Sequence, residues 1–470
     1  MTTYLYHQLE QQLRLKISSG QLAAQSKLPS IRVMCLEAEV SKSTVITAYS
    51  RLEAEGLIEA RSKSGYYVCA KGRQSEHQLK TPATSNPASA PKLISRTQVM
   101  LDLMKRGAAF DLLSSSQPDP HNIFLRRCLS KALRSQSGNE QHYYDQPQGD
   151  EFLRIQLAKV INQGGGNITC DQVIVSNGCQ HSLLMALMVA TEPNDVVAIE
   201  SPGFYGALQL LEVLGRRVLE IPSSVVDGIS PDALRLAADH WNIKALIVSP
   251  SYTTPTGACM PNHNKQQILQ LAEQHQFCII EDDIYAGLHF TSQRPSTIYS
   301  DDKTGSVILC SSFSKSLSRD LRIGWIVSKK YHQQILALKV ATSMASGISQ
   351  QQGVASFIAQ GGLDKHLKLR RQQLALQRDQ MLYLIQQHLP MVQSISRPTG
   401  GMVAWVELES NINTLHLYHQ AKEKGLTITP GSLFGAQDTY QHYLRLSFAH
   451  PWTAPRIEAC KVLATLIAKH

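Results

Sequence analysis

The sequence predicts a multi-domain protein, in which a small α+β head precedes a large α/β body with a mostly parallel sheet and a smaller α+β lobe at the C-terminal end. The chain of 470 residues is longer than an ordinary domain of about 100–200 residues. Between residues 70 and 93, prolines and small polar residues replace almost every apolar one. After this stretch, short β-rich runs alternate with longer amphipathic segments, which is typical of a parallel sheet covered by helices on both faces.

Positive charge is concentrated near the N-terminus. The formal net charge is +9, and residues 1–95 hold twelve Lys and Arg against seven Asp and Glu. An excess of basic side chains favours polyanions such as nucleic acids as partners. A nucleic-acid site is therefore expected in the N-terminal fifth of the chain.

The nine cysteines are scattered along the chain, with no Cys-x-x-Cys pair and no histidines at zinc-site spacing. This pattern predicts reduced thiols and no metal site, as in a cytoplasmic protein. The N-terminus lacks a basic and then apolar signal pattern, and no apolar run approaches about 18 residues. The sequence therefore predicts neither export nor a membrane partner.

The head is expected to contain three helices. The first is predicted from apolar residues that recur at every fourth position, namely Leu5, Leu9, Leu13 and Ile17. A second, short helix should begin after Ser30, whose hydroxyl can cap it. The cluster of hydroxyls at residues 41–44 is a capping signal for the third helix.

The third helix is predicted to have one apolar and one polar face. The apolar face consists of Val45, Ala48, Tyr49 and Leu52. The opposite face is short, polar and cationic, as a helix in the major groove requires. It carries Lys42, Ser43, Thr44, Thr47 and Arg51.

A β-hairpin is expected after the third helix, with strands at residues 57–61 and 66–68. Its tip carries Arg61 and Lys63, whose charge suits contact with phosphate at a wing. From periodicity alone, a three-helix domain with a solvated charged face explains the head equally well.

The body begins with seven strand-like runs. They lie at residues 172–176, 196–200, 217–221, 245–249, 278–281, 306–310 and 324–327. From residue 351 to residue 389 the pattern predicts one long helical tract. It leads to strands at 402–408 and 443–447, which belong to the smaller C-terminal lobe.

One lysine of the body is surrounded by groups that bind anions. Lys315 can form a Schiff base with the aldehyde of pyridoxal phosphate, and Arg322 offers a planar fork for phosphate oxygens. The hydroxyls of Ser312 and Ser314 can donate to the same phosphate. The sequence therefore predicts a pyridoxal phosphate site around Lys315.

Other groups that this cofactor requires follow strands of the body. Asp282 follows a buried run at the carboxyl edge, where α/β sheets bind ligands, and its carboxylate can keep the pyridine nitrogen protonated. Three residues later, Tyr285 can reach the ring hydroxyl. The run 176–180 opens a helix whose amides can hold phosphate, and Phe204 is a candidate stacking ring. Each signal is weak alone, and their occurrence together in this order supports the prediction.

The head resembles the winged helix-turn-helix of GntR-type regulators. The matching runs are Leu28-Pro-Ser-x-Arg32, Ser41-Lys-Ser-Thr-Val45, Ala48-Tyr49, Leu52-x-Ala-Glu-Gly56-Leu-Ile and Ser64-Gly-Tyr-Tyr-Val68. The resemblance implies a partner, double-stranded operator DNA. The residues that it places on this DNA are Arg32, Lys42, Ser43, Thr44 and Gly65, next to the wing charges Arg61 and Lys63.

The body resembles the class I, fold-type I aminotransferases over residues 110–470. The resemblance implies that Lys315 holds pyridoxal phosphate as an aldimine. It assigns Asp282 to the pyridine nitrogen and Tyr285 to the ring hydroxyl, as the other catalytic residues. It also implies a phosphate cup that consists of Gly178, Cys179, Gln180, Ser312, Ser314 and Arg322.

The same resemblance assigns two residues far from the lysine motif. Arg445 corresponds to the arginine that grips a substrate α-carboxylate through a bidentate pair, and its flanking leucines argue against a plain surface guanidinium. Tyr144 corresponds to the tyrosine that reaches the phosphate of the neighbouring subunit. A homodimer is therefore implied.

Three residues depart from the aminotransferase pattern. Thr254 stands where an asparagine usually faces the ring oxygen, and Cys179 stands where a small hydroxyl residue is common. Phe204 lacks the hydroxyl of the more usual tyrosine. These departures preserve the expectation of cofactor binding and weaken that of efficient transamination.

A GntR-type head joined to an aminotransferase-like body is the arrangement of the MocR subfamily of bacterial transcription regulators, which the chain resembles over nearly its whole length. The implied domains are the head at 1–70, a linker at 71–95 and the body at 96–470. The body divides into a large lobe at about 145–345 and a small lobe at about 350–470.

The implied function is that of a regulator in which pyridoxal phosphate, or an amino compound sensed at the Lys315 aldimine, modulates DNA binding. The alternative is a functional aminotransferase of amino acids with an accessory DNA-binding head, because Lys315, Asp282, Tyr285 and Arg445 are all present. Turnover with amino acids and keto acids distinguishes the two. A third possibility, a purely structural body, predicts a protein without the visible absorbance of the cofactor.

Overall fold

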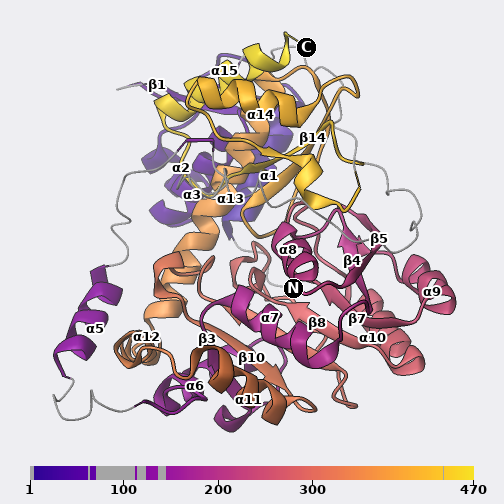
Figure 1. Cartoon of the computed structure of the whole chain (residues 1–470). Helices are drawn as coiled ribbons and strands as arrows, with labels where there is room; N and C mark the ends of the chain where they lie inside the picture. Colours follow the sequence, from indigo (N-terminus) through magenta and orange to yellow (C-terminus); the bar gives the residue numbers. More distant parts are fainter. Residues whose placement is uncertain are drawn as a thin grey trace.

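The computed structural model (Figure 1) describes most of the head and body. The described residues are 5–61, 64–69, 112–113, 123–135, 144–437 and 439–469. The predicted linker at 71–95 and the wing residue Lys63 lie outside this set.

The head contains three helices and a hairpin in the order that the sequence predicts. They are α1 (Leu5–Ser18), α2 (Ile31–Glu37), α3 (Lys42–Ala54), β1 (Ile58–Arg61) and β2 (Gly65–Val68). Ser30 caps α2 by accepting a hydrogen bond from the Val33 amide at 3.3 Å. Ser41 caps α3 in the same way, from the Thr44 amide at 3.2 Å. The apolar faces of all three helices meet the hairpin in one small core.

The body is built on an eight-stranded sheet with the order β3-β10-β9-β8-β7-β4-β5-β6. Its strands are β3 (Val173–Ser176), β4 (Val196–Ser201), β5 (Arg217–Ser224), β6 (Gly228–Ile229), β7 (Ile243–Val248), β8 (Cys278–Asp282), β9 (Val307–Ser312) and β10 (Gly324–Ser328). The central strands run parallel, and β10 runs antiparallel to both β9 and β3. The parallel strands are buried on both faces, which explains why they read as continuous apolar runs.

Helices cover both faces of this sheet, as the alternating pattern predicts. Val173 and Ile174 are adjacent in β3, yet they belong to different cores, because neighbouring side chains of a strand point to opposite faces. One core is completed by α7 (Cys179–Ala190), α8 (Tyr205–Val213) and α11 (His332–Ser343). The other receives α5 (Ile123–Arg134), α6 (Glu151–Asn162), α9 (Pro231–His240), α10 (Asn262–His275) and α12 (Ile348–Ala359).

The smaller lobe has an antiparallel sheet with the order β11-β12-β14-β13. Its elements are β11 (Val392–Ile395), β12 (Val403–Leu408), α14 (Thr414–Glu423), β13 (Thr429–Pro430), β14 (Tyr443–Ser447) and α15 (Ala454–Ile467). The single helical tract predicted for residues 351–389 is wrong. The structure has two helices there, α12 and α13 (Gly362–His388), because Gly361 adopts a left-handed conformation with φ +73° that interrupts the first helix.

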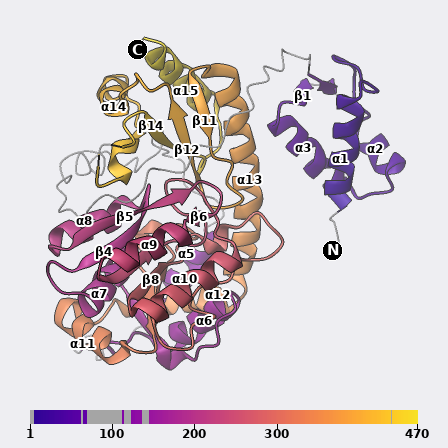
Figure 2. The ribbon, with the colours of Figure 1, turned by 90° about the vertical axis from the view of Figure 1, so that its right-hand side faces the viewer.

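The head lies beside α13, as two perpendicular views show (Figures 1 and 2). Within the described residues, no helix combines the length and the apolar character that crossing a membrane would require.

Candidate cofactor pocket and DNA-binding face

A pocket of about 550 Å³ opens at the carboxyl ends of the central strands, within the usual size range for small-ligand sites. Asp282 is the last residue of β8, and Lys315 follows its parallel neighbour β9. Because β10 runs antiparallel to β9, its first residues lie at the same edge, which brings Arg322 to the pocket. The topology thus gathers three residues that are far apart in the sequence.

Most of the predicted cofactor residues line this pocket. They are Cys179, Gln180, Phe204, Thr254, Asp282, Tyr285, Ser312, Ser314, Lys315 and Arg322. Gly178 adjoins the pocket through Arg322, and Arg445 contacts Thr254. The described part of the chain therefore brings together every predicted body residue except Tyr144.

Asp282 is a buried carboxyl group held by two donors. Its Oδ1 accepts a hydrogen bond from the Cys179 thiol at 3.2 Å and another from the Ile284 amide at 3.2 Å. Burial raises the pKa of Asp282 to about 6, and the two hydrogen bonds oppose this rise. The side chain of Cys179 thus faces the carboxylate, a role that no sequence pattern indicated.

The pKa of the Lys315 amine is shifted in opposite directions by its surroundings. Burial and the positive charge of Arg445 lower the pKa of Lys315 to about 8, although the carboxylate of Asp282 favours the charged form. A lowered pKa makes the neutral, nucleophilic amine more abundant near neutral pH.

An anion cradle forms at the first turn of α7. Gly178 caps this helix with φ +92°, and a Cβ at this position would lie 2.7 Å from Nη2 of Arg322. Arg322 donates from Nη2 to the Asn177 carbonyl at 2.8 Å, which fixes its guanidinium beside the helix start. Backbone amides at a helix N-terminus, a guanidinium and two serine hydroxyls together form a donor set that fits a phosphate group.

Aromatic and polar side chains close the other side of the pocket. Phe204 lies next to Tyr205, with ring centroids 4.8 Å apart. Tyr285 is buried, and burial raises the pKa of its phenol far above the ordinary value, so that the group remains a neutral donor. Tyr205 also lines the pocket, although no motif in the sequence pointed to it. Its position directly after Phe204, the candidate stacking ring, is a sequence signal that could have identified it.

Arg445 is a buried arginine on β14, 4% exposed. It donates from Nη1 to Thr254 at 3.4 Å and from Nη2 to Thr429 at 3.3 Å. Its charge also acts on Tyr205, where it partly offsets the rise in pKa that burial causes. The guanidinium is therefore placed beside the pocket and not on the outer surface.

Tyr144 lies apart from the pocket and is 79% exposed. The loop that carries it is firmly held, because Arg154 donates to the Gly149 carbonyl at 3.0 Å and Lys339 donates to the Pro147 carbonyl. The amide of Asp150 donates to Gln351 at 2.8 Å. The loop thus presents Tyr144 outward.

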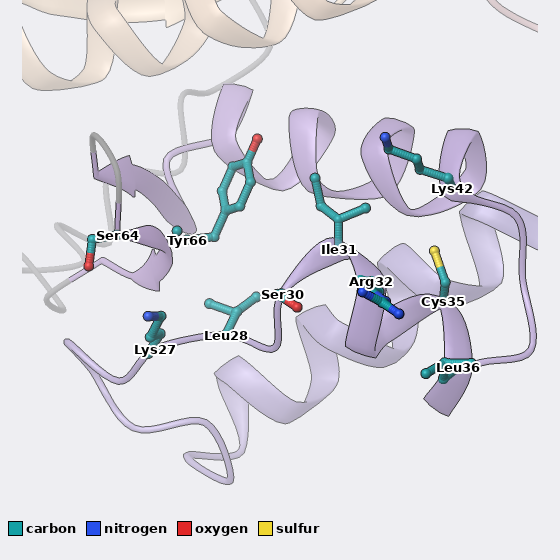
Figure 3. A pocket seen from close by; sticks show the side chains of 11 residues that line it. Lys27, Leu28, Ser30, Ile31, Arg32, Cys35, Leu36, Lys42, Ser64 and Tyr66 are labelled. Carbon is teal, nitrogen blue, oxygen red and sulfur yellow. The ribbon is translucent and has the colours of Figure 1, made fainter.

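The head has a groove of about 810 Å³ between α2, the start of α3 and the hairpin (Figure 3). Arg32, Lys42 and Gly65 line it, so that three predicted DNA-facing residues share one surface. Ser43 and Thr44 lie beside it at the start of α3, where both hydroxyls hydrogen-bond Ser41 at 2.8 Å.

Arg61 is engaged elsewhere in the head. Its guanidinium pairs with Glu59 at 2.6 Å and lies 4.4 Å from the centroid of the Tyr67 ring. Arg61 does not line the groove.

Both the head and the body match known protein families. The family model described as aminotransferase class I and II matches residues 112–463, and that described as bacterial regulatory proteins, gntR family, matches residues 5–68. The chain is 35% identical to the HTH-type transcriptional regulator YjiR of Escherichia coli K12, over 98% of both chains. It is 28% identical to the HTH-type transcriptional regulator NorG of Staphylococcus aureus USA300, over 90% of this chain and 95% of the relative.

Among solved structures, the kynurenine aminotransferase of Pyrococcus horikoshii is similar, with a TM-score of 0.71 and 25% identity over 80% of this chain and 95% of that one. The resemblance of the relatives over the full length includes both the head and the body. The chain therefore belongs to the MocR-type transcriptional regulators, which join a gntR-family DNA-binding head to an aminotransferase class I and II body.

Proposed function

We propose that the protein is a cytoplasmic, homodimeric regulator whose binding to operator DNA is modulated by pyridoxal phosphate, or by an amino compound that reacts at Lys315. The observation that carries this proposal is the convergence of Lys315, Asp282 and Arg322 on one pocket in a chain that also has a winged head. The similar kynurenine aminotransferase was solved with PMP, which supports a pyridoxal-type ligand for this fold.

The residues of the pocket have complementary roles toward this cofactor. Lys315 would hold its aldehyde carbon covalently, and Asp282 would hold a proton on its ring nitrogen. When bound, the cofactor supplies an electrophilic carbon that exchanges amino groups. Arg322 and the start of α7 would bind its phosphate, and Arg445 would orient the carboxylate of an amino acid.

In the head, we propose that the groove faces DNA. Arg32 and Lys42 would contact phosphates, and Ser43 and Thr44 at the start of α3 would face base edges. Gly65 has φ +106° and no side chain, so that the wing backbone can approach the DNA closely.

The proposal is tested with a DNA duplex selected by the protein from a random-sequence pool. The dissociation constant is measured by fluorescence anisotropy with and without pyridoxal phosphate, for the wild type and for Lys315→Ala. A change of about fivefold or more in the wild type, absent in Lys315→Ala, is expected. Equal affinity with and without the cofactor in the wild type would refute the modulation.

An aminotransferase function remains the second candidate, because Arg445 stands beside the pocket that holds Lys315, Asp282 and Tyr285. The short side chain of Thr254 is already engaged with Arg445, which favours sensing over turnover. Product formation from a panel of amino acids and keto acids decides the matter. Many turnovers per subunit would establish the enzyme, and one half-reaction or none supports the regulator.

A further inference from the structure

Helix α13 extends from the loop that carries Lys315 to the head. It has 27 residues, which corresponds to about 40 Å of continuous helix. Near its N-terminal end, Nε2 of His366 lies 3.0 Å from the carbonyl oxygen of Ser316, the residue after Lys315. Five residues further along α13, Arg371 donates from Nε to the carbonyl of Gly287 at 2.8 Å, and Gly287 lies two residues after Tyr285. This end of the helix therefore contacts the two loops that carry Lys315 and Tyr285.

The opposite end of α13 contacts the head through Tyr383. A Cβ built on Gly56 would lie 2.1 Å from Cε2 of the Tyr383 ring, far inside contact distance. The ring therefore lies directly against the backbone of Gly56, just after the end of α3. Helices α3 and α13 pack side by side in both perpendicular views (Figures 1 and 2).

Two arginines on these helices form their ion pairs within their own parts of the protein. Arg378 of α13 is paired with Asp379 at 2.7 Å and donates to the Pro398 carbonyl at 2.7 Å, all within the body. Arg51 of α3 is paired with Glu10 at 2.7 Å within the head. Burial lowers the pKa of Arg378, and the charge of Arg51 contributes weakly in the same direction. The contact of the Tyr383 ring with Gly56 is uncharged, and an uncharged contact of this kind is suited to reversible docking.

Docking leaves the DNA-facing end of α3 open. Lys42 and Ser43, at the start of α3, are exposed, whereas Gly56 follows its last turn. The contact with α13 thus fixes the orientation of the recognition helix from behind, without covering the residues proposed to contact DNA.

We propose that α13 is the docking surface for the winged head, and that the contact of Tyr383 with Gly56 transmits the state of the Lys315 pocket to DNA binding. This inference rests on the proposed function and adds the surface through which the regulation acts. A ligand that shifts the loops of Lys315 or Tyr285 would move the helix that His366 and Arg371 attach to them. A movement of one rigid helix changes the position of its far end.

The test compares Tyr383→Ala with the wild type in the full-length protein. The affinity for the selected duplex is measured with and without pyridoxal phosphate, and cofactor binding is measured separately by its visible absorbance. We expect Tyr383→Ala to bind the cofactor as the wild type does, and to show less than about a twofold effect of cofactor on DNA affinity. Its maximum dimension in small-angle X-ray scattering should increase, because the head is no longer docked.

Glycine variants provide a matched control. Gly56→Ala introduces a Cβ that collides with Tyr383 and should also lose the cofactor effect. Gly20→Ala imposes a similar positive φ, +80° against +68°, but has nothing within 4 Å, and should keep the effect. The double variant Gly56→Ala with Tyr383→Ala should behave like Tyr383→Ala alone, since the collision is removed.

The outcomes separate this inference from the proposed function. If the wild type responds to the cofactor and Tyr383→Ala responds equally, or scatters identically to the wild type, the docking surface is refuted and the proposed function stands. If the DNA affinity of the wild type does not respond to the cofactor, the proposed function fails, and the proposed transmission through Tyr383 and Gly56 fails with it.

Discussion

The thiol of Cys179 donates a hydrogen bond to the buried carboxylate of Asp282 across 3.2 Å. Burial raises the pKa of the thiol well above its ordinary value, so that Cys179 acts as a neutral donor. The hydrogen bond favours the ionised form of Asp282, against the rise in pKa that burial causes. A cysteine at this position therefore preserves the donor that a hydroxyl residue would supply.

Removal of this donor should weaken cofactor binding. Cys179→Ala is expected to raise the pKa of Asp282 further above about 6, because burial is no longer opposed by the thiol. The carboxylate is the form that binds a protonated ring nitrogen, so affinity should fall as the pH drops through this pKa, and should do so at higher pH in the variant. A loss of about fivefold, equivalent to about 1 kcal/mol, is expected at neutral pH, measured by absorbance titration at several pH values.

Two variants control this prediction. Cys179→Ser keeps a donor and should retain most of the affinity. Cys278→Ala removes a thiol that is as exposed as that of Cys179, at 6%. The Cys278 thiol donates to the backbone carbonyl of Ile279 and not to a carboxylate. Equal pH profiles for Cys179→Ala and Cys278→Ala would contradict the role assigned to the thiol.

The reaction of Lys315 with pyridoxal phosphate should depend on pH. Below its pKa of about 8 the ammonium form predominates and cannot attack an aldehyde, so the rate should rise with pH through this value and level off above it. Arg445→Met removes a positive charge that lowers this pKa, and should shift the rise to higher pH. Stopped-flow absorbance measures both midpoints, and coincident curves would show that Arg445 does not act on Lys315.

The anion cradle should not tolerate a side chain at Gly178. Gly178→Ala places a Cβ 2.7 Å from Nη2 of Arg322 and forces an unfavourable φ of +92° on alanine. We expect at least a tenfold loss of affinity for pyridoxal phosphate, about 1.4 kcal/mol, with a smaller loss for pyridoxal, which lacks the phosphate. Gly215→Ala has a positive φ of +64° with nothing within 4 Å and serves as the control. Parallel losses for both ligands would indicate general disruption and not a phosphate site.

The head residues should contribute to DNA binding through charge. Arg32→Ala and Lys42→Ala should each weaken binding to every duplex and reduce the slope of log affinity against log salt by about one. Lys16→Ala removes an exposed lysine on α1 that does not line the groove, and should leave the slope unchanged. The slopes are obtained from anisotropy titrations over a range of salt concentrations, and equal slopes for Lys42→Ala and Lys16→Ala would argue against the groove as the DNA face.

Local signals in the sequence were sufficient for most of the fold. Buried parallel strands such as β8 read as apolar runs, and serine caps mark the starts of α2 and α3, because both depend on neighbouring residues alone. The break between α12 and α13 was missed although Gly361 and Gly362 are adjacent in the sequence. The glycine pair is a local signal for the end of a helix, and the left-handed φ of Gly361 is the conformation that such a glycine allows.

Contacts between distant segments were not predictable in the same way. The hydrogen bond from Cys179 to Asp282 joins residues 103 positions apart, and its formation depends on the order of strands in the sheet. The contact of Tyr383 with Gly56 joins the body to the head. Gly56 belongs to a run that matches the GntR-type head, but no motif pairs it with Tyr383. Which residues line the pocket could be predicted from motifs, whereas how they bond one another required the fold.

The outward-pointing Tyr144 has a consequence for how the regulator would respond to its own abundance. Its loop is held in place by Arg154 and Lys339, yet the tyrosine adds nothing to the pocket of its own chain. If it reaches the pocket of a second copy, as the aminotransferase resemblance implies, retention of pyridoxal phosphate becomes a property of the pair. Dilution would then dissociate the dimer and release pyridoxal phosphate. At low cellular concentration the protein would therefore not respond to a signal that it detects at high concentration.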